Sequence, residues 1–392
     1  MRTPPQQIRL LLLMSVAMPI AWATWSALLN NFVVERAAFT GAEIGILQSL
    51  REVPGFLAFT AVFVLLVLRE PTFAILSLAV LGLGVALTGV FPTEYGLYFT
   101  AVLMSIGFHY FETVKQSLSL QWLHKEEAPQ LLGRMIAAGA LTSLIVYALL
   151  WVMFEWLAID YIWVYLLAGG LCMGLAVYMR TSFPVFSSES TQHMELFLRR
   201  RYWLYYALTF FSGARRQIFV VFAGFMMVEK FGYSVSQIAL LYLINHVFNY
   251  LFAERIGALI GRIGERRALI IEYVGLICVF TGYAFVNDAT LAAVLYVIDH
   301  LFFALAIAIS TYLQKIGDPE DMAGTAGVSF TISHIAAVVI PALLGYVWLT
   351  SPGLVFLVGT GFAFCSLILA LNVPEKPGRG NEVRIGRVSL AA

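Results

Sequence analysis

The sequence predicts an all-α integral membrane protein with twelve transmembrane helices. Of its 392 residues, 60% are hydrophobic and 12% are charged, whereas soluble domains carry about 25% charged residues. The apolar residues stand in runs of about 20, the length of one spanning helix, and not in the alternating ten-residue segments of a membrane barrel. Twelve spans with short connections use almost the whole chain, so no sizeable soluble domain is expected.

Short connections rich in turn residues separate the expected spans. They include residues 92–94 (Pro-Thr-Glu), 287–288 (Asn-Asp) and 350–353 (Thr-Ser-Pro-Gly), which are residue types that cap or stop helices. The first apolar run resembles a signal peptide, but it continues to Val34 and is therefore interpreted as an uncleaved span. The expected spans are residues 10–34, 43–68, 72–91, 97–123, 131–154, 161–179, 202–230, 236–260, 268–286, 290–313, 323–349 and 354–371.

The longest connection, residues 180–201, is Ser-rich and ends in three consecutive arginines. It divides the spans six and six, so we expect an N-terminal half (1–190), a central cytoplasmic linker (180–201) and a C-terminal half with a short tail (202–392). Span two aligns with span eight when it is shifted by 194 residues: Thr40, Glu43, Ile44 and Leu47 fall on Ser234, Gln237, Ile238 and Leu241. This repeat predicts two parallel six-helix pseudo-repeats, related by an axis along the membrane normal.

The lysines and arginines predict the orientation. With the N-terminus inside, the inner connections and tails hold 17 of these residues and the outer connections hold two. Because cytoplasmic loops are enriched in Lys and Arg, both termini are expected in the cytoplasm, with the protein crossing the cytoplasmic (inner) membrane many times.

Several classes of function lack their sequence signals. The formal net charge is +1, and no basic cluster suggests nucleic-acid binding. The cysteines, Cys172, Cys278 and Cys365, stand alone, so neither a metal site nor a disulfide is expected. There is no nucleophile elbow, phosphate-binding loop or dinucleotide fingerprint. We therefore expect no enzyme activity, no cofactor and no nucleotide-driven pump.

The connection after span eight carries a family resemblance. Residues 257–269, Gly-Ala-Leu-Ile-Gly-Arg-Ile-Gly-Glu-Arg-Arg-Ala-Leu, resemble the Gly-x-Leu-x-Asp-Arg-x-Gly-Arg-Arg loop of the major facilitator superfamily. Gly261 replaces the acidic residue of that signature, and the equivalent loop after span two is reduced to residues 69–71 (Arg-Glu-Pro). The resemblance implies a secondary transporter that works by rocking of its two halves, with Arg262 and Arg266 in the inward gate.

Adjacent arginines in span seven are the first candidates for solute binding. Arg215 and Arg216 follow the start of the span by about fourteen residues, roughly 20 Å along a helix, which is central depth. Because neighbouring side chains diverge by about 100°, one is expected to face the solute while the other pairs with a carboxylate. Alternatively, both are held in salt bridges to Glu112, Asp299 or the backbone.

Acidic residues in spans four and ten are the candidates for proton coupling. His109, Glu112 and Lys115 are spaced three apart and share one helix face. Glu112 either neutralises Lys115 or carries the coupling proton, and Asp299, next to His300, is the second candidate.

Other ionisable and aromatic residues complete the expected site. Arg51 and Glu52 form a gate pair or simply neutralise each other, because a charge within the bilayer must face protein or water. The small-residue pairs Gly41/Gly45 and Gly170/Gly174 are expected to allow close helix approach. Besides the two arginines, the expected solute contacts are Trp25, Asn31, His109, Tyr110, His246, Asn249 and His300.

Taken with the resemblance, these residues predict a proton-coupled transporter. Its expected solute is a small organic anion or zwitterion, because the charged residues expected to be buried in the spans leave one positive charge: Arg51, Lys115, Arg215 and Arg216 against Glu52, Glu112 and Asp299. Its other expected partners are protons and membrane lipid, and a monomer is expected. Two alternatives remain open: proton-driven efflux of hydrophobic drugs, and a sensor or lipid-handling scaffold that retains the fold without transport.

Overall fold

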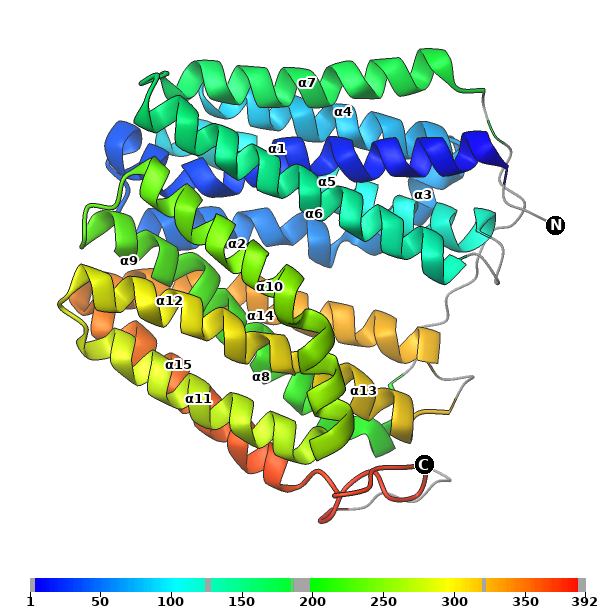
Figure 1. Ribbon diagram of the computed structural model, residues 1–392, viewed down its shortest axis with the longest axis vertical. Helices are drawn as coiled ribbons and strands as arrows, with labels where there is room; N and C mark the ends of the chain where they lie inside the picture. The colour runs from blue at the N-terminus through cyan, green and yellow to red at the C-terminus, as the bar shows by residue number, and fades with distance from the viewer. Residues whose placement is uncertain (1–3, 124–127, 185, 187–197, 319–321, 387–392) are drawn as a thin grey trace. The chain divides into compact units, whose positions relative to one another are not determined.

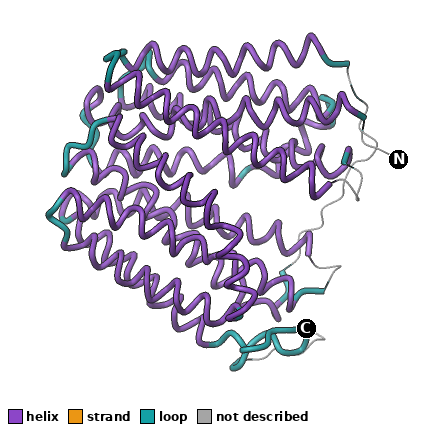
Figure 2. The backbone as a smooth tube through the Cα atoms, viewed as in Figure 1, coloured by secondary structure: helices purple, strands orange, loops and turns teal. Residues whose placement is uncertain are grey.

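The computed structural model describes residues 4–123, 128–184, 186, 198–318 and 322–386, which form helices joined by short connections (Figure 1). Figure 2 shows no strand in this part of the chain, where Gly378 and Asn381 form an isolated bridge. The α-helices are α1 (Pro5–Ala37), α2 (Gly41–Phe56), α3 (Ala61–Leu65), α4 (Glu70–Thr88), α5 (Glu94–Trp122), α6 (Ala128–Glu155), α7 (Tyr161–Ser182), α8 (Trp203–Ile218), α9 (Gly224–Glu229), α10 (Val235–Ile263), α11 (Glu265–Phe285), α12 (Ala289–Phe303), α13 (Ile307–Ile316), α14 (Met322–Thr350) and α15 (Pro352–Leu371).

Helical segments occupy each of the twelve expected ranges, and three of these ranges are interrupted. A 3-10 turn at Ala58–Thr60 separates α2 from α3, a second at Ala304–Ala306 separates α12 from α13, and a π-helical segment, Phe219–Ala223, separates α8 from α9. Within the described residues, nine helical segments are long and apolar enough to cross a membrane. An all-helical chain with several apolar spans is therefore confirmed, while the count of twelve stays a prediction.

Turn residues begin several helices, and Thr93, Asp288 and Ser351 among them lie in the expected connections. The side chains of Thr93, Asp160, Asp288 and Ser351 each accept a hydrogen bond from a backbone N–H in the first turn of α5, α7, α12 and α15, respectively. These caps satisfy amide groups that have no partner inside the helix. Local chemistry at the connections therefore positions the ends of the apolar helices.

The described chain divides into two compact units. The first comprises residues within 1–39, 50–192 and 233–243, and the second comprises residues within 40–49, 193–232 and 244–392. The first unit thus includes the first turns of α10, and the second unit includes the first turns of α2. The remainder of each of these helices is assigned to the other unit.

In the first unit, α4 packs most extensively against α5 and α7, and α1 packs against α6 and α7. The α4 to α7 contact depends on glycine, because a Cβ at Gly169 would lie 2.3 Å from the carbonyl oxygen of Gly82. Gly170 and Gly174 do not serve this purpose, since no other described atom would lie within 4 Å of a Cβ at either position. The expected close approach at that pair is wrong because the two glycines lie on the exposed side of α7.

In the second unit, α11 packs against α15, and α8 packs against α14 and α15. The start of α2 also belongs here and lies against α14. A Cβ at Gly45 would lie 2.3 Å from the carbonyl oxygen of Pro341, and one at Gly41 would lie 2.2 Å from Cγ of Trp348. The close approach expected at Gly41 and Gly45 is therefore confirmed.

Candidate functional site

A buried charge cluster lies inside the second unit, where α8, α11 and α12 meet. Arg215 Nη2 lies 3.3 Å from Glu272 Oε1, and the exposed fractions of these two side chains are 1% and 0%. The Arg215 guanidinium also lies over the ring of Tyr273, with 4.6 Å between Cζ and the ring centroid. Its Nε donates to the carbonyl oxygen of Phe211 at 3.3 Å, one turn earlier in α8. Arg215 is therefore the arginine that pairs with a carboxylate.

Asp299 adds a second acid to this cluster. Its residue is 4% exposed, and it interacts electrostatically with both Arg215 and Glu272. Three buried polar atoms of the cluster, Arg215 Nη1, Glu272 Oε2 and the Tyr273 hydroxyl, have no hydrogen-bond partner in the described chain. With both acids ionised the cluster carries one net negative charge, which is costly in a buried site. One bound proton makes it neutral, so the arrangement is suited to hold and release a proton.

Glu272 is a site residue that the sequence analysis missed. Its signal was present, because Glu272 is the lone carboxylate in the apolar range 268–286. Its position near the start of that range resembles a residue at the membrane boundary. The helix starts earlier, at Glu265, which places Glu272 two turns inside α11.

Arg216 has different surroundings from Arg215. It is exposed, and its guanidinium lies 5.5 Å from the ring centroid of Phe303. His300 interacts electrostatically with Arg216 and with His246, so these three basic groups form a second cluster, the Arg216 cluster. The divergence of adjacent helical side chains places the two arginines in these separate clusters.

The ring of His300 is held in a defined orientation. Its Nδ1 donates to the carbonyl oxygen of Tyr296 at 3.0 Å, so Nε2 is the nitrogen that remains for another partner. The rings of Tyr296 and Phe219 lie 5.0 and 5.7 Å from the imidazole. Phe219 opens the π-helical segment that follows α8, and such segments are frequent at functional sites.

An aromatic and ionic cluster occupies the first unit. Arg51 and Glu52 form a buried ion pair, and the Arg51 guanidinium lies 5.4 and 6.0 Å from the ring centroids of Trp22 and Trp25. Trp25 Nε1 is buried and has no hydrogen-bond partner within the described chain. Arg51 and Glu52 are therefore paired with each other, and their role as a gate stays a prediction.

Span four adds two aromatic rings to this cluster. Phe108 stacks on Trp22 with 4.1 Å between ring centroids, and it lies 5.0 Å from the ring of His109. A ring nitrogen of His109 and a carboxylate oxygen of Glu52 lie within 4.8 Å of each other. His109 therefore lies near the Arg51–Glu52 ion pair.

Other expected contacts are taken up elsewhere. The Tyr110 hydroxyl lies 2.6 Å from Thr60 Oγ1, and Asn31 Nδ2 donates to the backbone carbonyl of Tyr233 at 2.6 Å. The side chain of Asn249 lies outside the described residues.

Lys115 pairs with Glu112 over 3.4 Å, and the side chain of Glu112 is 41% exposed. Glu112 is therefore far less buried than Asp299 or Glu272.

The expected gate arginines lie at the ends of α10 and α11. Arg262 is exposed, while Arg266 Nη1 lies 3.5 Å from Glu375 Oε1 in the C-terminal tail. Gly264, between the two helices, has a φ of +83°, a conformation that favours glycine. The adjacent Glu265 is buried and pairs with Lys315 over 2.6 Å.

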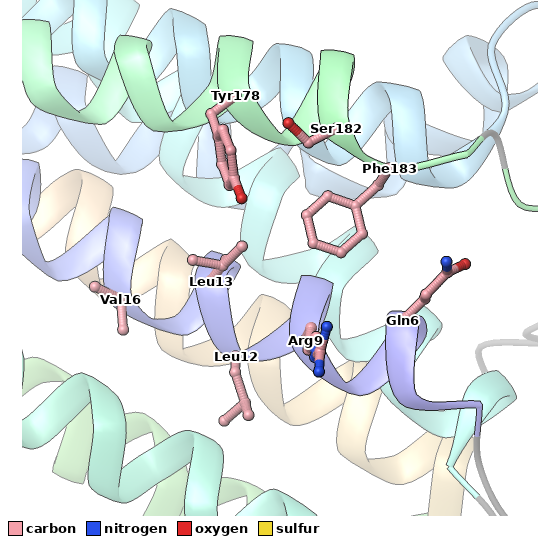
Figure 3. Close-up of a pocket in the computed structure, with 8 residues that line it drawn as sticks. All are labelled: Gln6, Arg9, Leu12, Leu13, Val16, Tyr178, Ser182 and Phe183. Atoms are coloured by element: carbon pink, nitrogen blue, oxygen red, sulfur yellow. The ribbon is translucent and has the colours of Figure 1, made fainter.

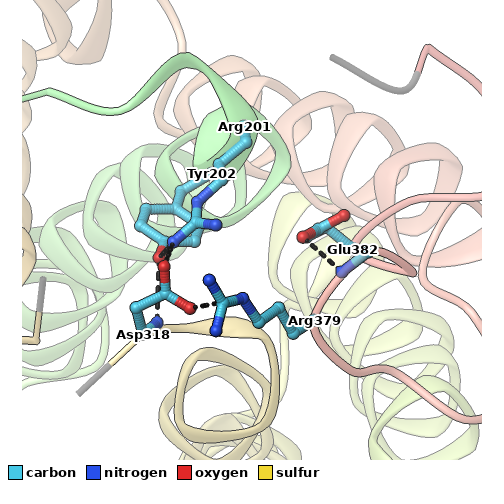
Figure 4. A network of polar contacts seen from close by, with 6 residues as sticks. Arg201, Tyr202, Asp318, Arg379 and Glu382 are labelled. Carbon is cyan, nitrogen blue, oxygen red and sulfur yellow. Dashed lines mark hydrogen bonds and ion pairs between the residues drawn. The ribbon is translucent and has the colours of Figure 1, made fainter. Parts of the chain in front are cut away.

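A polar network ties the tail to the same end of the second unit (Figure 4). Arg201 forms an ion pair with Asp318, and Arg379 Nε lies 3.0 Å from the other oxygen of that carboxylate. The amide of Asp318 donates to the Tyr202 hydroxyl at 3.0 Å. The tail therefore bonds to residues at the ends of spans seven and ten.

Long apolar helices with buried charged groups indicate a membrane protein with a polar functional site, as membrane transporters have. The chain belongs to the Major Facilitator Superfamily, whose sequence profile matches residues 10–341. Membership makes the chain a multi-pass membrane transporter of small-molecule solutes rather than an enzyme, and it confirms the resemblance seen in the sequence.

Known proteins support this assignment. An uncharacterized MFS-type transporter of Methanocaldococcus jannaschii is 25% identical over 134 residues, which is 34% of this chain and 34% of that protein. The match thus spans about a third of the relative's length. A structure of the nucleoside transporter NupG is similar with a TM-score of 0.77 and 15% identity, covering 93% of this chain and 99% of that one.

A second similar fold is that of a bacterial homolog of the human lysosomal transporter Spinster, in an inward-facing, unoccupied conformation. Its TM-score is 0.69 at 13% identity, covering 94% of this chain and 95% of that one. At these identities the two structures establish the shared fold alone.

Proposed function

We propose that this protein is a proton-coupled secondary transporter of a small organic anion or zwitterion. The observation that carries the proposal is the pair of adjacent arginines, one in the buried acidic cluster and one with two histidines. Arg216 supplies two parallel donors for a carboxylate or phosphate, which a lysine cannot supply. His246 and His300 are further candidate contacts, and because His300 Nδ1 donates to the Tyr296 carbonyl, its Nε2 is an acceptor while the ring is neutral. Trp25 remains a candidate contact.

Coupling is assigned to the buried acids. Glu272 pairs with the Arg215 guanidinium and Asp299 interacts with both groups electrostatically, so a proton that one of the acids binds changes the cluster from one negative charge to neutral. Glu112 is the alternative acid and serves as the comparison, because its side chain is 41% exposed and pairs with Lys115. We also propose that Arg51 and Glu52 act as a gate pair. Arg262 and Arg266 are proposed to belong to the inward gate.

The proposed transport cycle is alternating access by two six-helix halves, with twelve spans and both termini in the cytoplasm. The distribution of Lys and Arg supports this orientation in the cytoplasmic membrane, with 17 inside and two outside. A functional monomer is part of the proposal.

A second candidate solute is an uncharged aromatic amphiphile, which includes hydrophobic drugs and nucleoside-like compounds. The stacked rings of Trp22 and Phe108, 4.1 Å apart, favour it, because aromatic side chains bind planar apolar groups. The similarity in fold to a nucleoside transporter is consistent with such a solute.

One screen separates the two candidates. Purified protein is tested by thermal shift against organic anions, zwitterions, nucleosides and drugs, since a ligand that binds the folded state raises its unfolding temperature. The proposal expects stabilisation by anions or zwitterions in the wild type and loss of this effect in Arg216→Ala. Stabilisation by neutral aromatics alone, lost in Trp22→Ala and retained in Arg216→Ala, would establish the second candidate instead.

A further inference from the structure

A cleft of 480 Å³ lies between the beginning of α1 and the end of α7 in the first unit (Figure 3). Its size is within the range of ligand sites in proteins, about 300 to 1,000 Å³. The N-terminal turns of α1 lie beside the C-terminal turns of α7, because the two helices are antiparallel. The lining residues are Gln6, Arg9, Leu12, Leu13, Val16, Tyr178, Ser182 and Phe183.

The cleft is polar at one end and apolar along the rest. Gln6 and Arg9 on α1 and Ser182 on α7 supply the polar end, while Leu13 and Val16 follow on the next turns of α1. Figure 3 shows the rings of Tyr178 and Phe183 extending from α7 toward α1. A ligand that matches this surface has a polar head and an apolar chain.

The polar end is positively charged. Arg9 is exposed, and within the described chain it has no carboxylate partner. Arg180, near the end of α7, is also exposed. The head group that complements this end is an anion.

The expected position of the cleft in the bilayer indicates that this amphiphile is a membrane lipid. The expected first span begins at Leu10, so Arg9 lies at the level of lipid head groups and the apolar wall lies at hydrocarbon depth. Arginines at this level attract anionic lipid head groups by about 1 kcal/mol each. Since Lys and Arg are concentrated on the inner side, the adjoining leaflet is the cytoplasmic one.

We propose that this cleft binds one anionic phospholipid, with its phosphate against Arg9 and one acyl chain along Leu13 and Val16. Gln6 and Ser182 donate hydrogen bonds to the head group. This site is separate from the Arg216 cluster, which belongs to the other unit, and it does not depend on the proposed solute.

The test measures lipid binding to the purified full-length chain in a neutral detergent. Phosphatidylglycerol is titrated against phosphatidylcholine and the bound lipid is counted by native mass spectrometry. In the wild type, phosphatidylglycerol is expected to bind more tightly than phosphatidylcholine. Arg9→Ala is expected to weaken phosphatidylglycerol binding about fivefold and Arg9→Lys to retain most of it. The matched control is Arg134→Ala, which removes an exposed arginine from α6 outside the cleft and is expected to bind as the wild type does.

A second variant tests the apolar half of the cleft. Val16→Trp fills it without changing charge, and it is expected to weaken phosphatidylglycerol binding while the solute-induced thermal shift is unchanged. Equal binding of the two lipids, or equal effects of Arg9→Ala and Arg134→Ala, would overturn the proposal. Displacement of phosphatidylglycerol by inorganic phosphate or glycerol phosphate at the same concentration would also overturn it, because the site would then recognise a free anion. Thermal unfolding of each variant verifies that it is folded, and if Arg9→Ala is not, Arg9→Gln replaces it.

Discussion

Replacing Glu272 by glutamine removes one negative charge from the buried cluster without removing its shape. The ion pair spans 3.3 Å, a distance at which two unit charges attract by about 5 kcal/mol at an effective dielectric constant of 20. The variant loses this attraction, but Arg215 keeps a counter-ion because Asp299 still interacts with it, and the amide oxygen can accept the Nη2 hydrogen bond. We expect a net destabilisation of about 1–3 kcal/mol, the usual range for a weakened buried hydrogen bond to a charged group.

The functional effect of Glu272→Gln is expected to be larger. With one acid left, the cluster is neutral without a bound proton, so it has no electrostatic reason to take one up. Accumulation driven by a pH gradient should therefore be lost, while exchange of labelled for unlabelled solute should persist. Arg215→Ala has the opposite charge effect, because it leaves two buried acids without a counter-ion, and it should cost about 3–5 kcal/mol of stability.

The assay uses proteoliposomes loaded with the solute that the thermal-shift screen identifies. Gradient-driven uptake and counterflow are measured in the same preparation for Glu272→Gln, Asp299→Asn and Glu112→Gln. The proposal expects loss of gradient-driven uptake in the first two variants and its retention in the third. Unimpaired gradient-driven uptake in Glu272→Gln, in Asp299→Asn and in the double variant would refute it. Glu112, Glu52, the histidines or a sodium-driven cycle would then have to be considered.

Arg216→Ala should weaken binding of an anionic solute about 10- to 100-fold, and Arg216→Lys should restore only part of it; unchanged affinity of the alanine variant in a ligand titration would contradict this assignment. Tags at both termini should react with impermeant reagents only after the cytoplasmic side is opened, and labelling of either tag in intact cells would reverse the predicted orientation. Gly45→Ala should lower the thermal unfolding midpoint, because its Cβ would lie 2.3 Å from the Pro341 carbonyl oxygen. Gly170→Ala should not, because its Cβ would have no described atom of another helix within 4 Å. Equal midpoints of the two variants would show that α2 and α14 can separate at no cost.

The helices could be predicted from the sequence because their signals are local. A run of apolar residues long enough to span a bilayer must satisfy its backbone groups internally, so it forms a helix whatever its neighbours are. Capping by Thr93, Asp288 and Ser351 depends on the next few residues alone. These features require no knowledge of tertiary packing.

Side-chain pairing could not be predicted in the same way. The sequence places Arg215 and Arg216 in one helix. It does not show that Glu272, on α11, pairs with Arg215 and not with Arg216, because this pairing depends on how α8 and α11 are placed in the folded unit. The glycines demonstrate the same limit. Gly45 and Gly170 carry the same small-residue pattern, yet only the first is packed against another helix.

The separation of the two arginines also determines the sign of the proposed coupling. While both acids are ionised, the buried charge cluster of Arg215, Glu272 and Asp299 carries one net negative charge, and this charge repels a solute anion bound at the next residue, Arg216. A proton on Asp299 or Glu272 removes the repulsion, so proton and anion each favour the binding of the other, because linkage between binding sites is reciprocal. The geometry therefore predicts symport rather than exchange for an anionic solute. Affinity for the anion should fall as pH rises in the wild type and should lose this dependence in Glu272→Gln, where the cluster is neutral without a proton. Binding that strengthens with rising pH in the wild type would assign the opposite sign and exclude these acids as partners of the Arg216 cluster.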